Sequence, residues 1–241
     1  CRGIGHTRRA ELMERFIEFA SSDRSNALAF LSHAVRLDDA AVVRVVARSD
    51  GLVALWAHTG FDVLATRSVT GRIAPTDIVC DASTLRATVE SAGPGTAVDP
   101  GFSLDSAWRG ALPAAVGFRH IDDVPARSVV ELSREGARVA REEGSGHGPA
   151  TGLLDQDVLE VTSEEGALRA AVSMRSVFAL TGMGFIRDAD GRAVTETSDT
   201  GAIAADEPVR IRMSAAWIRI DARFGSVYQR RHRDLAVTVL N

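Results

Sequence analysis

Closely spaced strand-like segments constrain the fold of this chain more than any other feature of its sequence. AVVRVVAR (41–48) and LVALWAHT (52–59) are rich in apolar residues, and only a Ser-Asp-Gly turn separates them. So short a turn joins neighbouring antiparallel strands. FDVLATRSV (61–69) and DIVCDA (77–82) extend the pattern, so this part of the chain predicts an antiparallel sheet.

The segment LVALWAHT is apolar on both of its faces. Alternation places Ala54 and Trp56 on one face and Val53 and Leu55 on the other. A strand with two apolar faces is central in its sheet and covered on both sides. We therefore expect Trp56 to be buried, within one chain or at a subunit contact.

Apolar spacing, charge pairs and turn residues predict helices at about 10–21, 26–36, 125–143 and 174–185, and a shorter helix after Ser83. Asp122 and Asp123 come just before the helix at 125–143. A carboxylate in that place caps the free N–H groups of a helix. Capping is therefore the first interpretation of these two residues.

The last third of the chain is predicted to be mostly sheet. DVLEV (157–161) and ALRAAVS (167–173) form a hairpin, and residues 187–207 form an exposed loop. Strands are then expected at VRIRM (209–213), AWIRID (216–221), GSVYQRR (225–231) and LAVTVL (235–240). Apolar and arginine residues alternate in several of them, which predicts a sheet with one face in water.

Two stretches, about 26–69 and 176–230, share the order of one helix followed by three strands. We predict an α+β protein with mainly antiparallel sheets and packed helices. The shared order of elements indicates two copies of a helix-plus-three-strand unit, or it reflects local patterns that are common in proteins. The predicted divisions are an N-terminal α+β unit at 1–92, a Pro/Gly-rich connector with the long helix at 93–156, and a C-terminal α+β unit at 157–241. One continuous domain is the alternative.

All 28 basic residues of the chain are arginine. Without lysine the chain has no amine for a Schiff base or a P-loop, and such a composition is typical of a GC-rich bacterium, above all an actinobacterium. The formal net charge of −4 gives no field that attracts nucleic acid or an anionic membrane. No apolar run reaches the length of a membrane helix. We therefore expect a cytoplasmic protein that binds neither nucleic acid nor membrane.

Cys1 opens the chain in place of a methionine. One interpretation is the lipid-modified cysteine of a mature lipoprotein. Arginines and an amphipathic segment follow it almost directly, however, where a lipoprotein has a longer Gly/Ser-rich tether. A truncated start is therefore the favoured interpretation.

His120, Asp122 and Asp123 form the best candidate for a catalytic site, because an imidazole beside carboxylates can exchange protons or bind a divalent metal. His147, in a Gly-rich stretch, is a further catalytic candidate. The preceding Pro/Gly-rich segment offers candidate ligand-binding residues, namely Trp108, Arg109 and Arg119. Capping remains the favoured role of the two aspartates, and the sequence predicts no metal site and identifies no cofactor.

Arg230, Arg231, His232 and Arg233 form the one dense basic cluster in the sequence. Arginine matches the geometry of phosphate groups, so a nucleic acid or phosphorylated ligand is conceivable here. Asp234 is adjacent, however, and the cluster falls in an expected turn. A solvated turn is the favoured interpretation.

The strings SAWRGALP (106–113), SGHGP (145–149) and RFGSVYQRR (223–231) resemble a family of actinobacterial proteins without an assigned function. The resemblance spans most of the chain and implies no catalytic residue. The first hypothesis is therefore a non-enzymatic binding or assembly module, acting through a protein partner, a homo-oligomer contact or a small ligand. The alternative is a metal-assisted or general acid/base enzyme that uses the 108–123 segment and His147.

Overall fold

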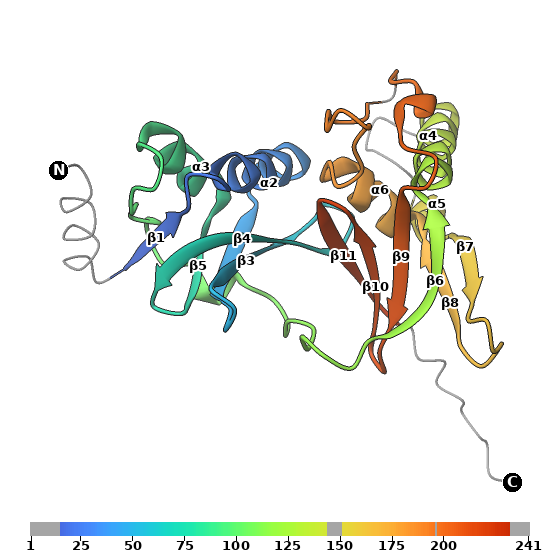
Figure 1. Cartoon of the computed structure of the whole chain (residues 1–241), viewed down its shortest axis with the longest axis horizontal. Helices are drawn as coiled ribbons and strands as arrows, with labels where there is room; N and C mark the ends of the chain where they lie inside the picture. Colours follow the sequence, from blue (N-terminus) through green and yellow to red (C-terminus); the bar gives the residue numbers. More distant parts are fainter. Residues whose placement is uncertain (1–14, 144–150, 196, 232–241) are drawn as a thin grey trace, which may run out of the picture.

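The strands from both ends of the sequence join in one antiparallel sheet in the computed structural model, which describes residues 15–143, 151–195 and 197–231 (Figure 1). The strands of this sheet are β1 (Phe16–Phe19), β2 (Val42–Ala47), β3 (Leu52–His58), β4 (Leu64–Ala74), β5 (Asp77–Asp81), β6 (Arg119–Pro125), β9 (Pro208–Met213), β10 (Trp217–Ala222) and β11 (Gly225–Arg230). They lie in the order β5-β2-β3-β4-β11-β10-β9-β6, and β1 pairs with the far end of β4. A separate hairpin consists of β7 (Asp157–Thr162) and β8 (Arg169–Ser173).

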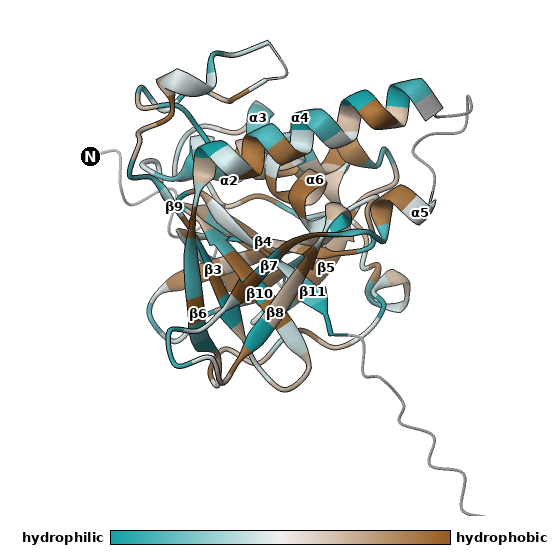
Figure 2. Cartoon of the chain, turned by 90° about the vertical axis from the view of Figure 1, so that its right-hand side faces the viewer, coloured by the Kyte–Doolittle hydropathy of each residue, from teal (hydrophilic) through white to brown (hydrophobic). Residues whose placement is uncertain are grey.

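The main helices lie on the same face of this sheet in two perpendicular views (Figures 1 and 2). The helices are α2 (Arg24–Leu37), α3 (Ala82–Ser91), α4 (Ala126–Glu143), α5 (Thr151–Leu154) and α6 (Met174–Gly182), with short 3₁₀ turns at Asp105–Ala107 and Thr200–Ala202. α2 packs beside α3, and α4 packs beside α6. We call the side of the sheet that carries these helix pairs the helix face, and the opposite side the outer face.

Alternating strand residues build a separate apolar core on each face of the sheet. The larger core fills the space between the sheet and the helices and includes the buried side chains of Leu31, Leu55 and Leu180. The smaller core lies on the outer face around Trp56 and Tyr228. Figure 2 shows the apolar character of α6 and of several strands in brown.

Trp56 is buried, with 9% of its surface exposed, as the alternation in its strand predicted. β3 lies between β2 and β4, so the strand is central in the sheet. α2 covers the face that carries Leu55. The side chains of Tyr228, Trp108 and Leu112 cover the other face, so one chain is enough to bury Trp56.

A glycine allows the close approach of the two helices in the second half of the chain. A Cβ atom on Gly136 of α4 would lie 2.6 Å from the terminal methyl carbon of Met174 and 3.0 Å from Cζ of Phe178, both in α6. Real Cβ atoms do not come so close to another atom, so only glycine fits this position without a shift of α6. The packing of α4 on α6 therefore depends on Gly136.

The predicted helix at 10–21 is wrong where the structure describes it, because Phe16–Phe19 form β1. Ile17 and Phe19 are buried and alternate with partly exposed neighbours, and β1 pairs with residues 71–74 of β4. The apolar residues of this segment suit a strand as well as a helix, and the free edge of β4 decided between them. Residues 10–14 and the strand predicted at 235–240 lie outside the described residues.

The other predicted helices and strands are confirmed, with shifts of a few residues at their ends. Both halves of the chain contain a helix followed by three consecutive antiparallel strands, α2-β2-β3-β4 and α6-β9-β10-β11. The third strands of the two sets, β4 and β11, pair with each other. The structure is thus a mixed fold of helices and antiparallel sheet, while the superposition of the two units and the division at residues 92 and 156 stay predictions.

Within the described ranges, no helix combines the length and the apolar character that a bilayer crossing requires.

Candidate functional site at the seam of the two halves

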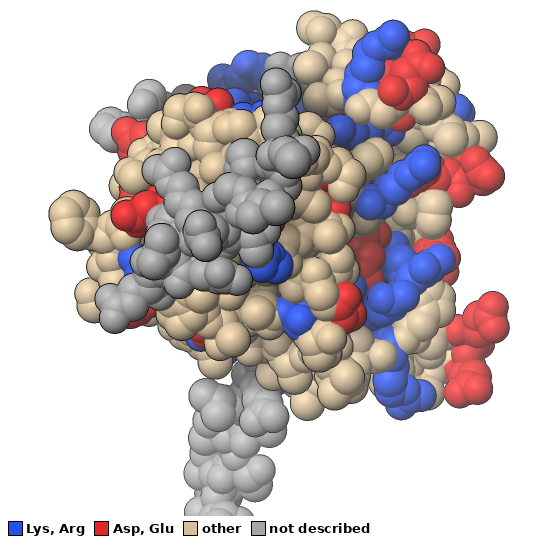
Figure 3. Space-filling view, turned by 60° about the vertical axis from the view of Figure 1, so that its left-hand side comes forward, with Lys and Arg blue, Asp and Glu red and all other residues tan. Residues whose placement is uncertain are grey.

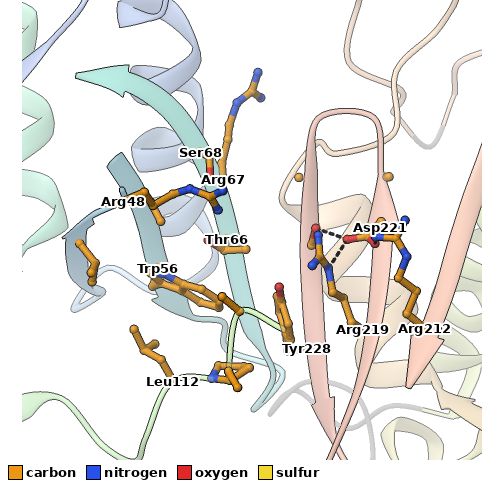
Figure 4. A pocket seen from close by; sticks show the side chains of 18 of the residues that line it. Arg48, Trp56, Thr66, Arg67, Ser68, Leu112, Arg212, Arg219, Asp221 and Tyr228 are labelled. Carbon is orange, nitrogen blue, oxygen red and sulfur yellow. Dashed lines mark hydrogen bonds and ion pairs between the residues drawn. The ribbon is translucent and has the colours of Figure 1, made fainter. Parts of the chain in front are cut away.

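The seam between the two halves of the chain is the short pairing of β4 with β11. Only Thr66, Ala65 and Leu64 of β4 are in register with Ser226, Val227 and Tyr228 of β11. Beyond Thr66, β4 continues toward β1, whereas β11 turns back into β10. The strands diverge there and leave a cleft of about 790 Å³ (Figure 4). We call it the seam cleft.

Arginine side chains dominate the lining of the seam cleft. They are Arg48, Arg67, Arg210, Arg212, Arg219 and Arg223. Asp221 is the one carboxylate residue that the structure describes in this lining. A chain with a net charge of −4 therefore concentrates positive charge at one place.

Ion pairs hold several of these arginines in position. Asp221 accepts from Nε of Arg219 at 2.6 Å, next to it in Figure 4, and from Nη1 of Arg212 at 2.9 Å. Carboxylates outside the lining pair with three further arginines of the cleft, as Arg48–Asp50 (2.7 Å), Arg210–Asp123 (3.0 Å) and Arg223–Glu207 (3.8 Å). On the face shown in Figure 3, by contrast, Arg and acidic side chains lie interspersed.

Aromatic rings form the floor of the cleft. The ring centroids of Trp56 and Tyr228 are 5.2 Å apart, and Trp217 meets Tyr228 edge to face at 6.5 Å. Tyr228 is 5% exposed, and burial raises the pKa of its phenol, with Arg219 opposing that rise. The phenol therefore stays protonated at neutral pH and can donate a hydrogen bond.

A second group of arginines surrounds Phe224 at the tip of the β10–β11 hairpin. The guanidinium carbons of Arg187, Arg67 and Arg223 lie 4.4, 5.5 and 5.8 Å from the centroid of the Phe224 ring. Burial lowers the pKa of Arg67, and the charge of Arg187 lowers it further. Among the described residues Arg67 forms no ion pair with a carboxylate, so like charges are held together here.

His33 of α2 connects this arginine group to the helix face. Burial lowers the pKa of His33, and the positive charges of Arg36, Arg187 and Arg67 lower it further. Arg36 also donates to Nδ1 of His33 at 2.9 Å and to the carbonyl oxygen of Gly182. We call His33, Arg36, Arg67 and Arg187 the helix-face arginine group. It lies where α2 of the first half meets α6 of the second.

The candidate site residues from the sequence do not gather in one cleft. His120 and Asp122 lie in β6 at the end strand of the sheet, and both are exposed. Arg119 is the exposed first residue of the same strand. Trp108 and Arg109 lie beside β3, where His58 Nε2 is 2.9 Å from the carbonyl oxygen of Arg109. His147 lies outside the described residues, so the roles of these side chains stay predictions.

The capping role predicted for Asp122 and Asp123 is wrong. Both residues belong to β6, which continues to Pro125, so their backbone is extended rather than turned into the first turn of α4. Asp123 binds Arg210 of β9 through both carboxylate oxygens, at 3.0 and 3.1 Å. Asp122 accepts the backbone N–H of Asp123. Asp123 is therefore used in a cross-strand ion pair and Asp122 in a local hydrogen bond, so neither carboxylate caps α4.

The seam cleft was not found from the sequence, although one signal for it was present. The strands VRIRM and AWIRID place Arg210, Arg212 and Arg219 on their wet face, as the alternation predicted. Their opposing partner Arg48, in contrast, follows β2 in the first half. In the basic cluster of the sequence, Arg230 packs over the Trp217 ring at 4.4 Å and Arg231 donates to the carbonyl oxygen of Ser214, while His232 and Arg233 lie outside the described residues.

No group of three His, Cys, Asp or Glu side chains within the described ranges is placed to hold a metal ion. Cys80 is buried in the core, and burial raises the pKa of its thiol to about 12. The seam cleft therefore offers cations and hydrogen-bond donors, the chemistry that binds anions.

Comparison with family models matches both halves of the chain. Residues 113–234 match the model described as Domain of unknown function (DUF8185), and residues 13–110 match the one described as Domain of unknown function (DUF8010). The comparison with curated proteins found no match.

Several solved structures share the fold at low sequence identity. The DNA polymerase sliding clamp from Bacillus subtilis has a TM-score of 0.55 and 13% identity, over 93% of this chain and 67% of that one. A putative DNA polymerase III beta subunit from Eubacterium rectale has a TM-score of 0.53 and 12% identity, over 92% and 67%. The DNA polymerase III beta chain from Streptococcus pneumoniae gives 0.51 and 11%, over 94% and 68%. The chain thus has a sliding-clamp fold and spans about two thirds of each clamp chain.

These likenesses overturn two expectations from the sequence. The first hypothesis, a binding or assembly module without nucleic acid, is wrong because the structures that share the fold are clamps of DNA polymerases by name. The expectation that no nucleic acid is a partner is wrong for the same reason. That expectation rested on the net charge, which is an average over the whole chain and does not show that six of its 28 arginines line one cleft.

Proposed function

Since the chain belongs to the family described as Domain of unknown function (DUF8185), which assigns no role, we propose from its fold that it is a clamp-like protein that surrounds duplex DNA. The observation that carries the proposal is the likeness to DNA polymerase sliding clamps over more than nine tenths of the chain. Such a protein works without chemistry of its own, by staying on DNA and holding partner proteins there.

The helix face is the side proposed to lie toward DNA. α2 contains Arg24 and Arg36 and no acidic residue. Arg24 donates to the carbonyl oxygens of Val89, Glu90 and Ala92 at the end of α3. A carbonyl oxygen orients a guanidinium but does not neutralise its charge, so these arginines keep a positive charge for phosphate groups.

The helix-face arginine group stands at the middle of this face. Arg36, Arg67 and Arg187 lie close enough to His33 to lower its pKa together, and the charge of Arg187 also lowers the pKa of Arg67. A phosphate group would relieve this repulsion, because it adds negative charge where cations are crowded. The cluster therefore supports contact with the DNA backbone and predicts no preference for base sequence.

Several copies are needed to surround a duplex. β5 and β6, the end strands of the sheet path, lie toward opposite ends of the molecule (Figure 1), so one copy is an open arc. We propose that copies of the chain join into a closed homo-oligomer. A role on chromosomal DNA agrees with the predicted cytoplasmic location, and the lysine-free composition supports the predicted actinobacterial origin.

The first test measures binding to DNA. Fluorescence anisotropy with a labelled duplex of mixed sequence should show binding that weakens steeply as salt is raised. Arg36→Glu should abolish it, because it reverses a charge in the helix-face group. Arg72→Glu is the matched control, since Arg72 is an exposed arginine of β4 paired with Glu18 and lies away from the helix face. Equal loss in both variants, or no binding by the unaltered protein, would contradict the proposal.

The second test asks whether the protein surrounds DNA. Copies are assembled on a nicked circular plasmid by dilution from conditions that separate them, and the complex is passed through a gel-filtration column. We expect the protein to remain with the circle and to be released when a restriction enzyme linearises it. Equal retention on circular and linear plasmid would show ordinary surface binding instead. Light scattering of the free protein gives the number of copies.

A further inference from the structure

The outer side of the seam cleft has the properties of a second binding site, separate from the helix face. We propose that it binds the phosphate monoester or pyrophosphate group of a small phosphorylated molecule, with Arg48, Arg219 and Tyr228 as the residues that touch this group. The inference goes beyond the proposed function and does not depend on it, because it concerns the opposite side of the sheet.

Cationic side chains from both halves of the chain converge on the Tyr228 hydroxyl. Arg48 follows β2 in the first half, and Arg219 belongs to β10 in the second. Both charges act on Tyr228, since each of them lowers the pKa of its phenol. Figure 4 shows Arg48 on one side of the cleft and Arg219 on the other, with Tyr228 between them. A group bound there would contact both halves at once.

The arginines are already oriented before a ligand arrives. Asp50 accepts from Nε and Nη2 of Arg48 at 3.1 and 2.7 Å. Asp221 holds Arg219 and is itself fixed by the hydroxyl of Ser226. Arginine positioned in this way loses little side-chain entropy when its remaining N–H donors bind a phosphate. The carboxylates thus act as supports for the guanidinium groups.

The charge balance of the outer side of the cleft suits an anion. Apart from Arg67, which belongs to the helix-face arginine group, the lining contains five arginines. Their ion-pair partners are four carboxylates, on Asp50, Asp123, Asp221 and Glu207. One net positive charge is therefore left, because Arg212 and Arg219 share Asp221. This surplus attracts an anion such as a phosphate group.

Tyr228 supplies a donor that has no other use. Its hydroxyl has no hydrogen-bond partner among the described residues, although the side chain is 5% exposed. Because burial keeps the phenol protonated, it can donate to a phosphate oxygen. The hydroxyl oxygen faces the cleft rather than the buried core, so a ligand oxygen would replace water as its acceptor.

The remaining wall of the cleft leaves room for the organic part of the ligand. Leu112, Pro113, Ala114 and Ala115 of the connector also line it. The volume of about 790 Å³ lies in the range of about 300–1,000 Å³ that small-molecule sites occupy. The combination of an apolar wall and an arginine wall fits a nucleotide-sized phosphorylated molecule.

Calorimetry with the full chain tests the site, with sulfate, inorganic phosphate, pyrophosphate and a nucleoside triphosphate as probes. We expect pyrophosphate and the triphosphate to bind. Tyr228→Phe removes one hydroxyl and should weaken binding about fivefold, and Arg219→Gln should weaken it at least about tenfold. Arg72→Gln should bind as the unaltered protein does. Thermal unfolding of Tyr228→Phe shows whether the core is kept.

Several results would overturn the proposal. They are no binding of any probe, equal binding of sulfate and pyrophosphate, or unchanged affinity in Tyr228→Phe. Competition by duplex DNA together with loss of DNA binding in Arg219→Gln would assign the cleft to the DNA backbone instead. The Arg36→Glu variant separates the two proposals, because it should lose DNA binding and keep pyrophosphate binding.

Discussion

Gly225, the first residue of β11, lies against the ring of Phe185, so that a Cβ on Gly225 would stand 2.4 Å from Cε1 of Phe185. Phe185 is 1% exposed and stacks with Phe30 of α2 at 6.3 Å. The start of the seam strand, the hairpin tip and the core under α2 therefore share one tightly packed contact.

Gly225→Ala should destabilise the protein by about 1–3 kcal/mol, because the added methyl group has to displace a buried ring. Gly152→Ala is the matched control, since Gly152 lies in α5 with no atom within 4 Å of its Cβ position. Urea unfolding compares the two variants. A Gly225→Ala protein as stable as the control would mean that Phe185 moves aside without cost.

Trp56→Ala should lower the free energy of unfolding by about 3–5 kcal/mol, because it empties the middle of the outer-face core. Fluorescence of a protein with Trp108 and Trp217 replaced by Phe should show a blue-shifted Trp56 that resists quenchers. Emission typical of a water-exposed indole would contradict the burial of this side chain.

Asp81 caps α3, and its loss should show a defined dependence on pH. Its carboxylate accepts from the backbone N–H of Thr84 at 2.7 Å and from Ser83 Oγ at 2.6 Å. Burial raises the pKa of Asp81, but these hydrogen bonds hold it below its ordinary value of 3.8. The cap therefore contributes its full stability above pH 4 and loses it as the pH falls through the lower pKa of the folded state.

Asp81→Ala should cost about 0.5–2 kcal/mol at pH 7, and the difference from the unaltered protein should shrink below pH 4. Asp81→Asn keeps a cap without a titrating group, so its stability should vary less over that range. Thermal unfolding from pH 2 to 7 gives both curves. An Asp81→Ala deficit that is the same at every pH would point to a packing effect.

His33 reports the crowding of charge on the helix face. Because burial and the neighbouring arginines hold its pKa below the ordinary 6.5, the folded state favours neutral His33. Its contribution to stability is therefore present above pH 6.5 and is lost as the pH falls toward the lower folded-state pKa. Arg187→Gln should raise the pKa of His33, as followed by NMR titration, whereas Arg192→Gln, whose arginine pairs with Asp190, should not.

Local structure was predictable here where the pattern of residues has one meaning. The alternation of AVVRVVAR and LVALWAHT gave two strands and their pairing, and Trp56 is buried as this pattern predicted. FIEF at 16–19 could serve as a helix or a strand, and its pairing with β4, more than 50 residues away, decided its structure. Long-range pairing of this kind leaves no local signal.

The seam cleft could not be predicted because it depends on which strands become neighbours. Arg48 and Arg219 are separated by most of the chain and meet only because β4 pairs with β11. In the same way, Asp123 and Arg210 form a cross-strand ion pair because β6 lies beside β9. The sequence shows each arginine as part of a wet strand face, and only the order of strands brings them to one cleft.

The narrow pairing of β4 with β11 divides the sheet into two parts, which we call plates: β5-β2-β3-β4 and β11-β10-β9-β6. Each plate has its own pair of helices, and three residue pairs join their sheets. Neighbouring strands twist by roughly 20–25° against each other, with considerable variation. A small change of twist at Leu64, Ala65 and Thr66 would therefore alter the curvature of the whole arc while each helix pair stays packed on its own plate.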